Sequence, residues 1–297
     1  PFLGREELNR FPVKQFLPDT PFADPLTTIV VDNKYILPAT QNWNLTLEHE
    51  ILSGTILRIG YVGTKSTHLL GEYDFNAPRY NYNLSLAQNR NTIDERRPIK
   101  GFQSIVRMMH GLGSIYNSLQ ISIDRRYARG ITAGGSYTWG RTIDYMSMNE
   151  WGGSARVNAF NFGHTRGLAD FDRTHRFVGS AVWDLPELSQ TSLPAAVKVI
   201  AGGWRMSGIV TLQSGIPFTI GSTGNPMAGG GAVRVDLVGS GYPILDPGRS
   251  KGEKIARYFD TSRFANAAPG TWGTLGRNAL IGPGYGNVDA SLVKTFR

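Results

Sequence analysis

The sequence has no cysteine among its 297 residues. Disulfide frameworks, thiolate nucleophiles and cysteine-ligated metal sites are therefore excluded. It also lacks the run of about 20 apolar residues that a membrane-spanning helix needs. Charged residues make up only 18% of the chain, against roughly 25% in ordinary soluble domains. These absences do not exclude a membrane β-barrel, because a barrel strand is polar at every second position and is not detected by a hydropathy scan.

Basic residues outnumber acidic ones, which gives a formal net charge of +8. A basic surface can meet nucleic acid, anionic lipid or an acidic substrate. Most of the charge is dispersed along the chain, and the densest segment, Arg90 to Lys100, also contains Asp94 and Glu95. We therefore expect solvated loops beside anionic surface lipid and no nucleic-acid partner.

The segment Tyr116 to Asp144 carries the strongest pattern in the chain. Apolar and polar residues alternate for about a dozen positions, a turn follows at Ala128 to Gly130, and the alternation resumes. A period of two is typical of a β-strand. Strands of this length, with aromatic residues toward their ends, are typical of a wall between lipid and water. The segment predicts a membrane-spanning β-hairpin.

The same pattern predicts seven long strands after an irregular, proline-rich segment at residues 1–40. The chain would thus consist of that segment and a partial outer-membrane β-barrel over residues 41–297. The expected strands lie near residues 41–50, 55–63, 116–127, 131–141, 173–184, 203–214 and 287–297.

The connections between these strands alternate in length. Those after the first, third and fifth strands are shorter, at 51–54, 128–130 and 185–202, and residues 195–201 could form a helical turn. The others are long, at 64–115, 142–172 and 215–286, and Phe102 to Met109 could add a hairpin there. Short turns on one rim and long extracellular loops on the other are typical of an antiparallel, up-and-down transmembrane barrel.

Several segments, taken in order, resemble the C-terminal barrel portion of the TonB-dependent receptor superfamily, in its Oar-like branch. Oar-like members carry a carboxypeptidase-regulatory-like domain, a plug and then the barrel. The matching segments are residues 41–48, 61–68, 116–120, 136–139, 170–177, 202–209, 213–218, 276–278 and 282–284.

The resemblance implies a plugged barrel of about 22 strands that imports a scarce solute across the bacterial outer membrane, powered through TonB. It implies outer-membrane lipid and lipopolysaccharide, the TonB complex, and an imported small solute or oligomer as partners. The sequence shows no plug, TonB-contacting segment or regulatory-like domain, and Arg297 follows Phe296 where the family ends on an aromatic residue. We therefore expect a fragment, whose TonB contact would lie in a missing N-terminal part.

The most tempting site comprises Asp170, Asp172, Arg173, His175 and Arg176. These residue types could support acid–base chemistry or a metal site. They straddle the start of a strand, so alternate side chains face apart. We favour charge pairing at a strand rim, and predict no catalytic, cofactor or metal site and no enzymatic activity.

Two further sets of residues could contact a ligand, although hydrogen bonding to a plug and packing among loops are the favoured alternatives. The lumen-facing set is Gln120, Asp124, Arg126, Arg205, Thr211 and Gln213. Aromatic side chains in the loops could stack on a sugar or hold a peptide: Tyr73, Tyr80, Tyr82, Trp151, Phe160, Phe162 and Trp272.

The sequence is compatible with three functions. The first is a ligand-gated importer in the outer membrane. The second is a passive or structural outer-membrane barrel, such as a pore or an adhesin. The third is a soluble all-β carbohydrate-binding module, which would require charged residues on the outward rows, whereas Leu119, Ile121 and Ile123 form an uncharged row. The ligand, the strand total and the oligomeric state cannot be read from the sequence.

Overall fold

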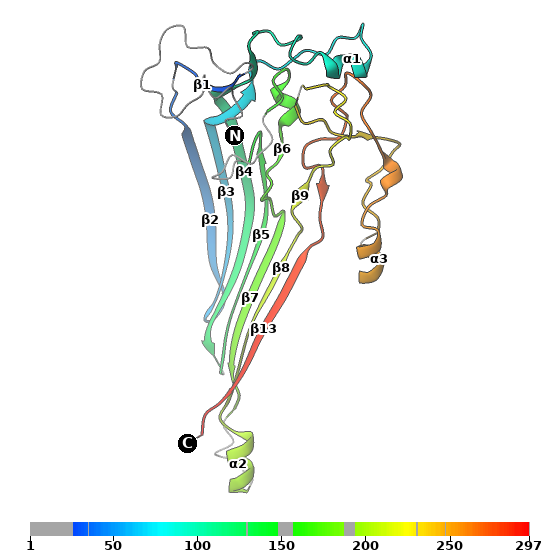
Figure 1. The fold of residues 1–297 in the computed structure, drawn as a ribbon. Coiled ribbons are helices and arrows are strands. Elements are labelled where there is room, and N and C mark those ends of the chain that lie inside the picture. The colour runs from blue at the N-terminus through cyan, green and yellow to red at the C-terminus, as the bar shows by residue number, and fades with distance from the viewer. Residues whose placement is uncertain are drawn as a thin grey trace, which may run out of the picture.

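The computed structural model describes residues 26–34, 36–128, 130–147, 157–186, 194–229, 231–246 and 248–296. Within them, seven long strands form one curved sheet (Figure 1). Their order across the sheet follows the chain, and each neighbouring pair is antiparallel. The strands are β2 (Ala39–Leu52), β3 (Thr55–Asp74), β4 (Phe102–Ala128), β5 (Ile131–Asp144), β7 (His175–Asp184), β8 (Trp204–Gln213) and β13 (Tyr285–Lys294).

The strand register places most of the apolar residues of the seven strands on one face. One row of directly opposite residues runs across the sheet as Leu47, Ile59, Ile121, Tyr137, Phe177, Leu212 and Gly286. The neighbouring row on the other face is Glu48, Arg58, Ser122, Ser136, Val178, Thr211 and Asn287. Since alternate side chains point to opposite faces, the sheet has an apolar face and a polar face. We call it the strand wall.

The apolar face is not covered by any other described part of the chain. Leu47 and Val288 are each 68% exposed and Leu212 is 49% exposed. Ile121 and Val210 are also partly exposed rather than sealed in an interior. The other two sheets have only two strands each, so the described residues do not form a two-layer sandwich. Such an apolar face is stable only against lipid, because a water-facing surface of this kind promotes aggregation.

Aromatic side chains lie at both ends of the apolar face. Trp139 and Tyr61 lie in a row toward one end, and Trp183 lies toward the other. In β7 the two rows are eight residues apart, which is about 27 Å along a strand or roughly 20 Å along the axis of a tilted barrel. Membrane barrels have an apolar band about 25 Å tall between aromatic girdles, so these rows match its two borders.

The polar face carries ion pairs between strands. Arg58 contacts Glu48 on one neighbouring strand and Asp124 on the other. Arg205 of β8 pairs with Asp184 of β7. Of the residues expected in the lumen, Asp124, Arg205 and Gln120 thus lie on this face, which suits water or a polar partner rather than lipid.

The short connections lie at one end of the sheet, together with α2 (Ala195–Ala201). Gly54 and Gly130 have φ values of +72° and +81° in the two tight turns, a backbone conformation that glycine adopts without steric cost. The helical turn considered for residues 195–201 is therefore present as α2.

At the other end, the connection expected over residues 64–115 is too long. β3 continues to Asp74 and β4 begins at Phe102, so only residues 75–101 connect them. The alternation fails there because the register shifts between Ser66 and Leu70, where His68 has a φ of +56°. A β-bulge inserts an extra residue and interrupts the period of two while the ladder continues.

The expectation that residues 1–40 are irregular is wrong for part of that segment. β1 (Leu26–Val31) pairs in parallel with the first part of β4, and β2 begins at Ala39. The run from Thr27 to Val31 consists of β-branched residues, which favour strands, although prolines surround it. Residues 1–25 lie outside the described part of the chain.

The long connections contain short elements. These are α1 (Leu86–Asn91), η1 (Phe162–Thr165), β6 (Gly167–Leu168), β9 (Pro217–Phe218), β10 (Asp236–Leu237), α3 (Lys251–Ala256), η2 (Thr261–Arg263), β11 (Phe264–Ala265) and β12 (Leu280–Ile281). We call residues 75–101, 157–174 and 214–284 the loop cap. No helix in the described ranges is both long and apolar enough to span a membrane.

The sheet does not close on itself. In the described residues, β2 and β13 each have a single neighbour, β3 and β8 respectively. An unpaired strand edge presents backbone donors and acceptors that lipid cannot satisfy. The strand wall therefore needs further pairing at both edges to be stable in a membrane.

Candidate functional site

The loop cap is joined to the polar face of the strand wall. Asp144, at the end of β5, pairs with Ser114 of β4 and continues the alternation of the polar face. It is 5% exposed, and Arg277 Nη1 donates a hydrogen bond of 2.6 Å to its carboxylate. Since Arg277 belongs to the last long connection, that connection contacts the polar side of the sheet, at the end of the strands that is uppermost in Figure 1.

Arg277 and Asn278 join two connections of the cap, residues 157–174 and 214–284, to each other and to the end of β5. Arg277 Nη2 donates to Asp170 Oδ1 at 2.9 Å, and Asn278 Nδ2 donates to the same oxygen at 2.6 Å. Asn278 also donates to the Leu168 carbonyl and exchanges hydrogen bonds with Thr219. Its φ of +53° lies in the left-handed region, which asparagine tolerates better than most residues. These bonds hold the cap to the end of β5.

The five charged residues around 170–176 do not converge on one point. Asp170 contacts Arg277 and Asn278, whereas Asp172, 3% exposed, accepts from the Thr142 backbone N–H at 2.6 Å. Arg173 Nη1 donates to the Ser214 carbonyl. His175 Nδ1 lies 2.7 Å from the Tyr137 hydroxyl. This arrangement anchors a strand rim mainly through backbone groups; the ion pair that the structure shows is that of Asp170 with Arg277.

The loop aromatics contact one another. Tyr73 packs edge-on against Phe162, Tyr80 against Tyr82, and Phe160 lies 6.2 Å from Trp272 between ring centroids. Tyr80 and Trp272 also cover a small buried cluster of Met227, Val233 and Ala267. Trp151 lies outside the described residues. Most of these rings therefore build the cap, and Trp272 additionally lines a cavity.

Asn76 fixes the first connection of the cap to β4. Its side chain is fully buried, and Nδ2 donates to the carbonyls of Ile99, Phe102 and Gln103. Its Oδ1 accepts from the Ile99 N–H at 2.8 Å. One side chain thus satisfies four backbone groups, which would otherwise be buried at a cost.

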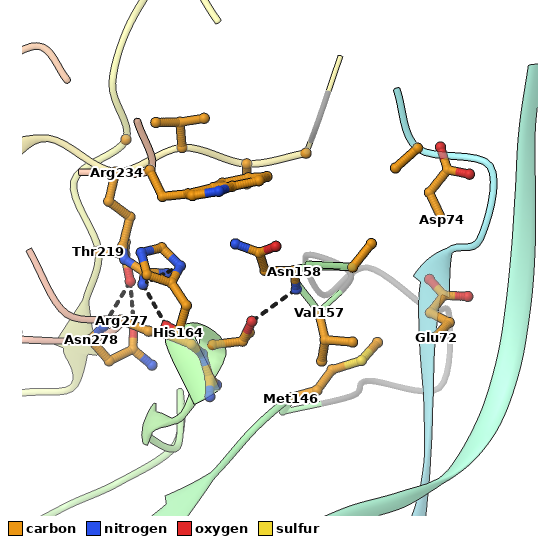
Figure 2. Close-up of a pocket in the computed structure, with 18 of the residues that line it drawn as sticks. Glu72, Asp74, Met146, Val157, Asn158, His164, Thr219, Arg234, Arg277 and Asn278 are labelled. Atoms are coloured by element: carbon orange, nitrogen blue, oxygen red, sulfur yellow. Dashed lines mark hydrogen bonds between the residues drawn. The ribbon is translucent and has the colours of Figure 1, made fainter. Parts of the chain in front are cut away.

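A cavity of about 780 Å³ lies inside the loop cap. This volume falls within the range of small-molecule sites, about 300–1,000 Å³. Its lining comes from β3, β4 and all three connections of the cap. Figure 2 shows Glu72 and Asp74 on one side and Arg234, His164 and Arg277 on the other. Asn158 lies between the two sides.

The basic side of the cavity is built around Arg234, which is 8% exposed. Arg234 Nη2 donates to His164 Nδ1 at 2.8 Å, and Nε donates to the Leu275 carbonyl at 2.6 Å. Burial, together with the charge of Arg277, lowers the pKa of Arg234 to about 10. Burial and the Arg234 charge also lower the pKa of His164. His164 is therefore neutral at pH 7, as its acceptor role at Nδ1 requires.

Residues 60–66 belong to the continuous strand β3 and thus do not form a phosphate-binding loop. Among the residues that the structure describes, no group of three histidine, aspartate or glutamate residues could hold a metal ion. Met146 lines the cavity.

Asp170 and Trp272 line the cavity and are candidates from the sequence, whereas the other polar residues of its walls had no predicted role. Arg277 and Asn278 lie in a segment that carried the family resemblance, which is the only signal that could have drawn attention to them. Glu72, Asn158 and Arg234 are isolated polar residues in long connections, with no motif around them. Only the folded cap brings them together.

A family model described as an outer membrane beta barrel domain matches residues 6–297. Comparisons with curated proteins and with solved structures found no match. Family membership implies location in the outer membrane, in agreement with the uncovered apolar face, and does not favour a soluble module. The chain belongs to the outer membrane beta barrel domain family.

Proposed function

We propose that this chain is part of a TonB-dependent outer-membrane receptor, of the Oar-like branch, that imports a scarce solute through a plugged barrel. In this proposal the apolar face contacts outer-membrane lipid and, in the outer leaflet, lipopolysaccharide. The polar face contacts a plug or water, and the barrel has about 22 strands. The protein has no enzymatic role.

The loop cap carries the proposal. Its three connections fold together and line a cavity of about 780 Å³ instead of extending separately into solvent. Arg277 holds this cap on the polar side of the sheet through Asp144. A preformed cavity above a lumen suits capture of a solute before transport, since ligand sites are concave and largely preformed.

The polar face supports the second part of the proposal. Arg58 and Arg205 form ion pairs on it, and their side chains remain 38% and 60% exposed. Exposed charged and hydroxyl groups on one side of a membrane wall need water or a hydrogen-bonding partner. A plug would supply that partner in a barrel too wide to be filled by its own side chains.

Uptake measurements test the proposal. Cells that lack the protein and cells that lack TonB should lose uptake of the same solute, whereas a passive pore would work without TonB. In a planar bilayer the intact protein should show no steady conductance. Steady conductance together with TonB-independent uptake would contradict the proposal and favour the pore.

A further inference from the structure

The cavity in the loop cap contains a buried cation, Arg234, whose hydrogen-bond partners are all neutral. Its guanidinium donates from Nε to the Leu275 carbonyl, and from Nη2 to Nδ1 and the carbonyl of His164. Nη1 has no acceptor in the described part of the chain. Arg234 is 8% exposed and lines the cavity. Burial of a charge without an opposite charge beside it is unfavourable.

The acidic side chains of the cavity lining already have partners of their own. Asp170 pairs with Arg277, and Asp74 pairs with Arg97. The charge that acts on Arg234 is that of Arg277, which together with burial lowers the pKa of Arg234 to about 10, so Arg234 is still protonated at pH 7. An anionic group on a bound molecule would supply the counter-charge that these contacts do not.

Asn158 has an unused hydrogen-bond donor in the same cavity. The residue is 7% exposed, and its Oδ1 accepts from the backbone N–H groups of Phe160 and Asn161. Its Nδ2 is buried and finds no acceptor among the described residues. Buried donors are nearly always satisfied in native proteins. This donor therefore indicates an acceptor oxygen on a bound molecule.

The remaining lining offers apolar and aromatic surface. Trp272, Val157 and Met146 all line the cavity, and Figure 2 shows Val157 and Met146 beside Asn158. The Trp272 ring is held by Phe160, at 6.2 Å between ring centroids. A fixed aromatic ring provides flat apolar area for a ligand to pack against.

We propose that this cavity binds a small organic molecule with one carboxylate group and an apolar body. Arg234 supplies the positive charge and a donor at Nη1, Asn158 supplies a second donor at Nδ2, and the apolar body packs near Trp272. The inference rests on the receptor function proposed above and names its substrate class.

Other ligand chemistries fit less well. A neutral oligosaccharide could stack on Trp272, but it would leave Arg234 without a counter-charge. A cationic solute would be repelled by Arg234. A phosphate group carries up to two negative charges at pH 7, where the site offers one unbalanced positive charge. A carboxylate has a single charge and two acceptor oxygens, which match one guanidinium and one further donor.

Calorimetric titration of the full protein in outer-membrane vesicles tests the inference, with vesicles that lack the protein as the blank. The probes are 3-phenylpropionate, its uncharged analogue 3-phenylpropionamide, acetate and inorganic phosphate. 3-Phenylpropionate should bind. The amide should bind about tenfold or more weakly, the usual effect of losing a charged hydrogen bond, and acetate should bind more weakly because it lacks the apolar body.

Three results would overturn the inference. They are equal binding of 3-phenylpropionate and its amide, tighter binding of phosphate than of 3-phenylpropionate, and no binding of any probe. This comparison uses the unaltered protein, so it does not depend on the folding of any variant.

A substitution at Asn158 locates the carboxylate. Asn158→Asp keeps the Oδ1 acceptor but removes the unused donor and adds a negative charge. It should weaken binding of 3-phenylpropionate about tenfold or more and affect the amide much less. The matched control is Asn266→Asp, outside the cavity lining, where Oδ1 likewise accepts a backbone N–H, that of Thr223. Equal effects of both substitutions would contradict the inference.

Uptake assays separate this inference from the receptor proposal. If 3-phenylpropionate binds as expected but no solute is imported through TonB, only the receptor proposal fails. If a solute is imported through TonB and 3-phenylpropionate does not bind, only the inference fails.

Discussion

The strand wall and the loop cap are held together in different ways. The wall depends on continuous backbone ladders, and its apolar face remains uncovered: Leu47 and Val288 are each 68% exposed. The cap has little regular structure, and a few polar side chains bind distant groups: Asn76 donates to the Phe102 carbonyl, and Arg277 donates to the Asp144 carboxylate. The wall is therefore stable only with lipid as its solvent, whereas the cap carries its own internal contacts in water.

The largest expected effect concerns the junction between the two regions. Arg277→Met leaves the Asp144 carboxylate, 5% exposed, without its cation. Removal of one partner of a buried ion pair costs about 3–5 kcal/mol. Hydrogen exchange of residues 214–284 should accelerate about 150- to 5,000-fold, since about 1.4 kcal/mol corresponds to a factor of ten, while the strand wall stays protected.

Arg263→Met is the matched control for that substitution. Arg263 lies in the same connection but, among the described residues, its side chain donates only to the carbonyls of Val238 and Gly241. Its replacement should have a much smaller effect on exchange. Equal acceleration in both variants would show that Arg277 does not anchor the cap.

A charge on the apolar face should destabilise the wall and spare the cap. Val210 lies in the middle of β8, opposite Val288 and Gly179. Val210→Arg should cost about 2–4 kcal/mol, as measured for arginine at the lipid face of membrane barrels. Denaturant unfolding of the protein in lipid vesicles measures this loss in the free energy of unfolding. Thr211→Arg, one residue away on the polar face, should cost less than about 1 kcal/mol, and a reversed order would contradict the assignment of the faces.

A smaller effect is expected at the aromatic border of the wall. The Trp43 indole lies across Gly63, where an added Cβ would come within 2.2 Å of its Nε1. Gly63→Ala should displace the ring and cost about 1–2 kcal/mol, visible as a shift in tryptophan emission and in the unfolding midpoint. Gly135→Ala, where the nearest atoms lie 3.8 Å away, should change neither.

The smallest expected effect is a pH dependence of the cap. Burial, and then the Arg234 charge, lower the pKa of His164 in the folded cap relative to about 6.5 when unfolded. The unfolded cap therefore takes up the proton first as the pH falls. Cap stability should be complete above about pH 6.5 and decrease below it, as measured by hydrogen exchange. His164→Gln should remove that part of the decrease, and an unchanged pH profile in this variant would contradict the assignment.

Alternation along the strands was sufficient to predict much of the wall. It placed Ile121 and Val210 on one face and Asp124 and Arg205 on the other, because register alone decides which face a residue occupies. It failed at the upper parts of β3 and β4, where the bulge at His68 interrupts the period. The alternation also missed β1, because a strand of only six residues in a proline-rich segment gives a weak signal.

The cavity could not be predicted in the same way. Its contacts join residues far apart in the sequence: Arg277 and Asp144 are separated by 133 positions, and Arg234 and His164 by 70. No local period or motif encodes such a pair. The Gly276 to Asn278 segment was noticed for its resemblance alone, and its role follows only from the folded cap.

Site-directed spin labelling tests the central claim most directly, namely that the two faces of the wall meet different solvents. The chain has no cysteine, so Val210→Cys and Thr211→Cys each provide a single attachment point. In lipid vesicles, the label at 210 should face lipid and collide with oxygen dissolved there. The label at 211 should face a plug and be shielded from oxygen, or face water and collide with a water-soluble nickel complex. If both labels respond alike, or if the pattern is reversed, the account of this chain as a membrane wall is wrong.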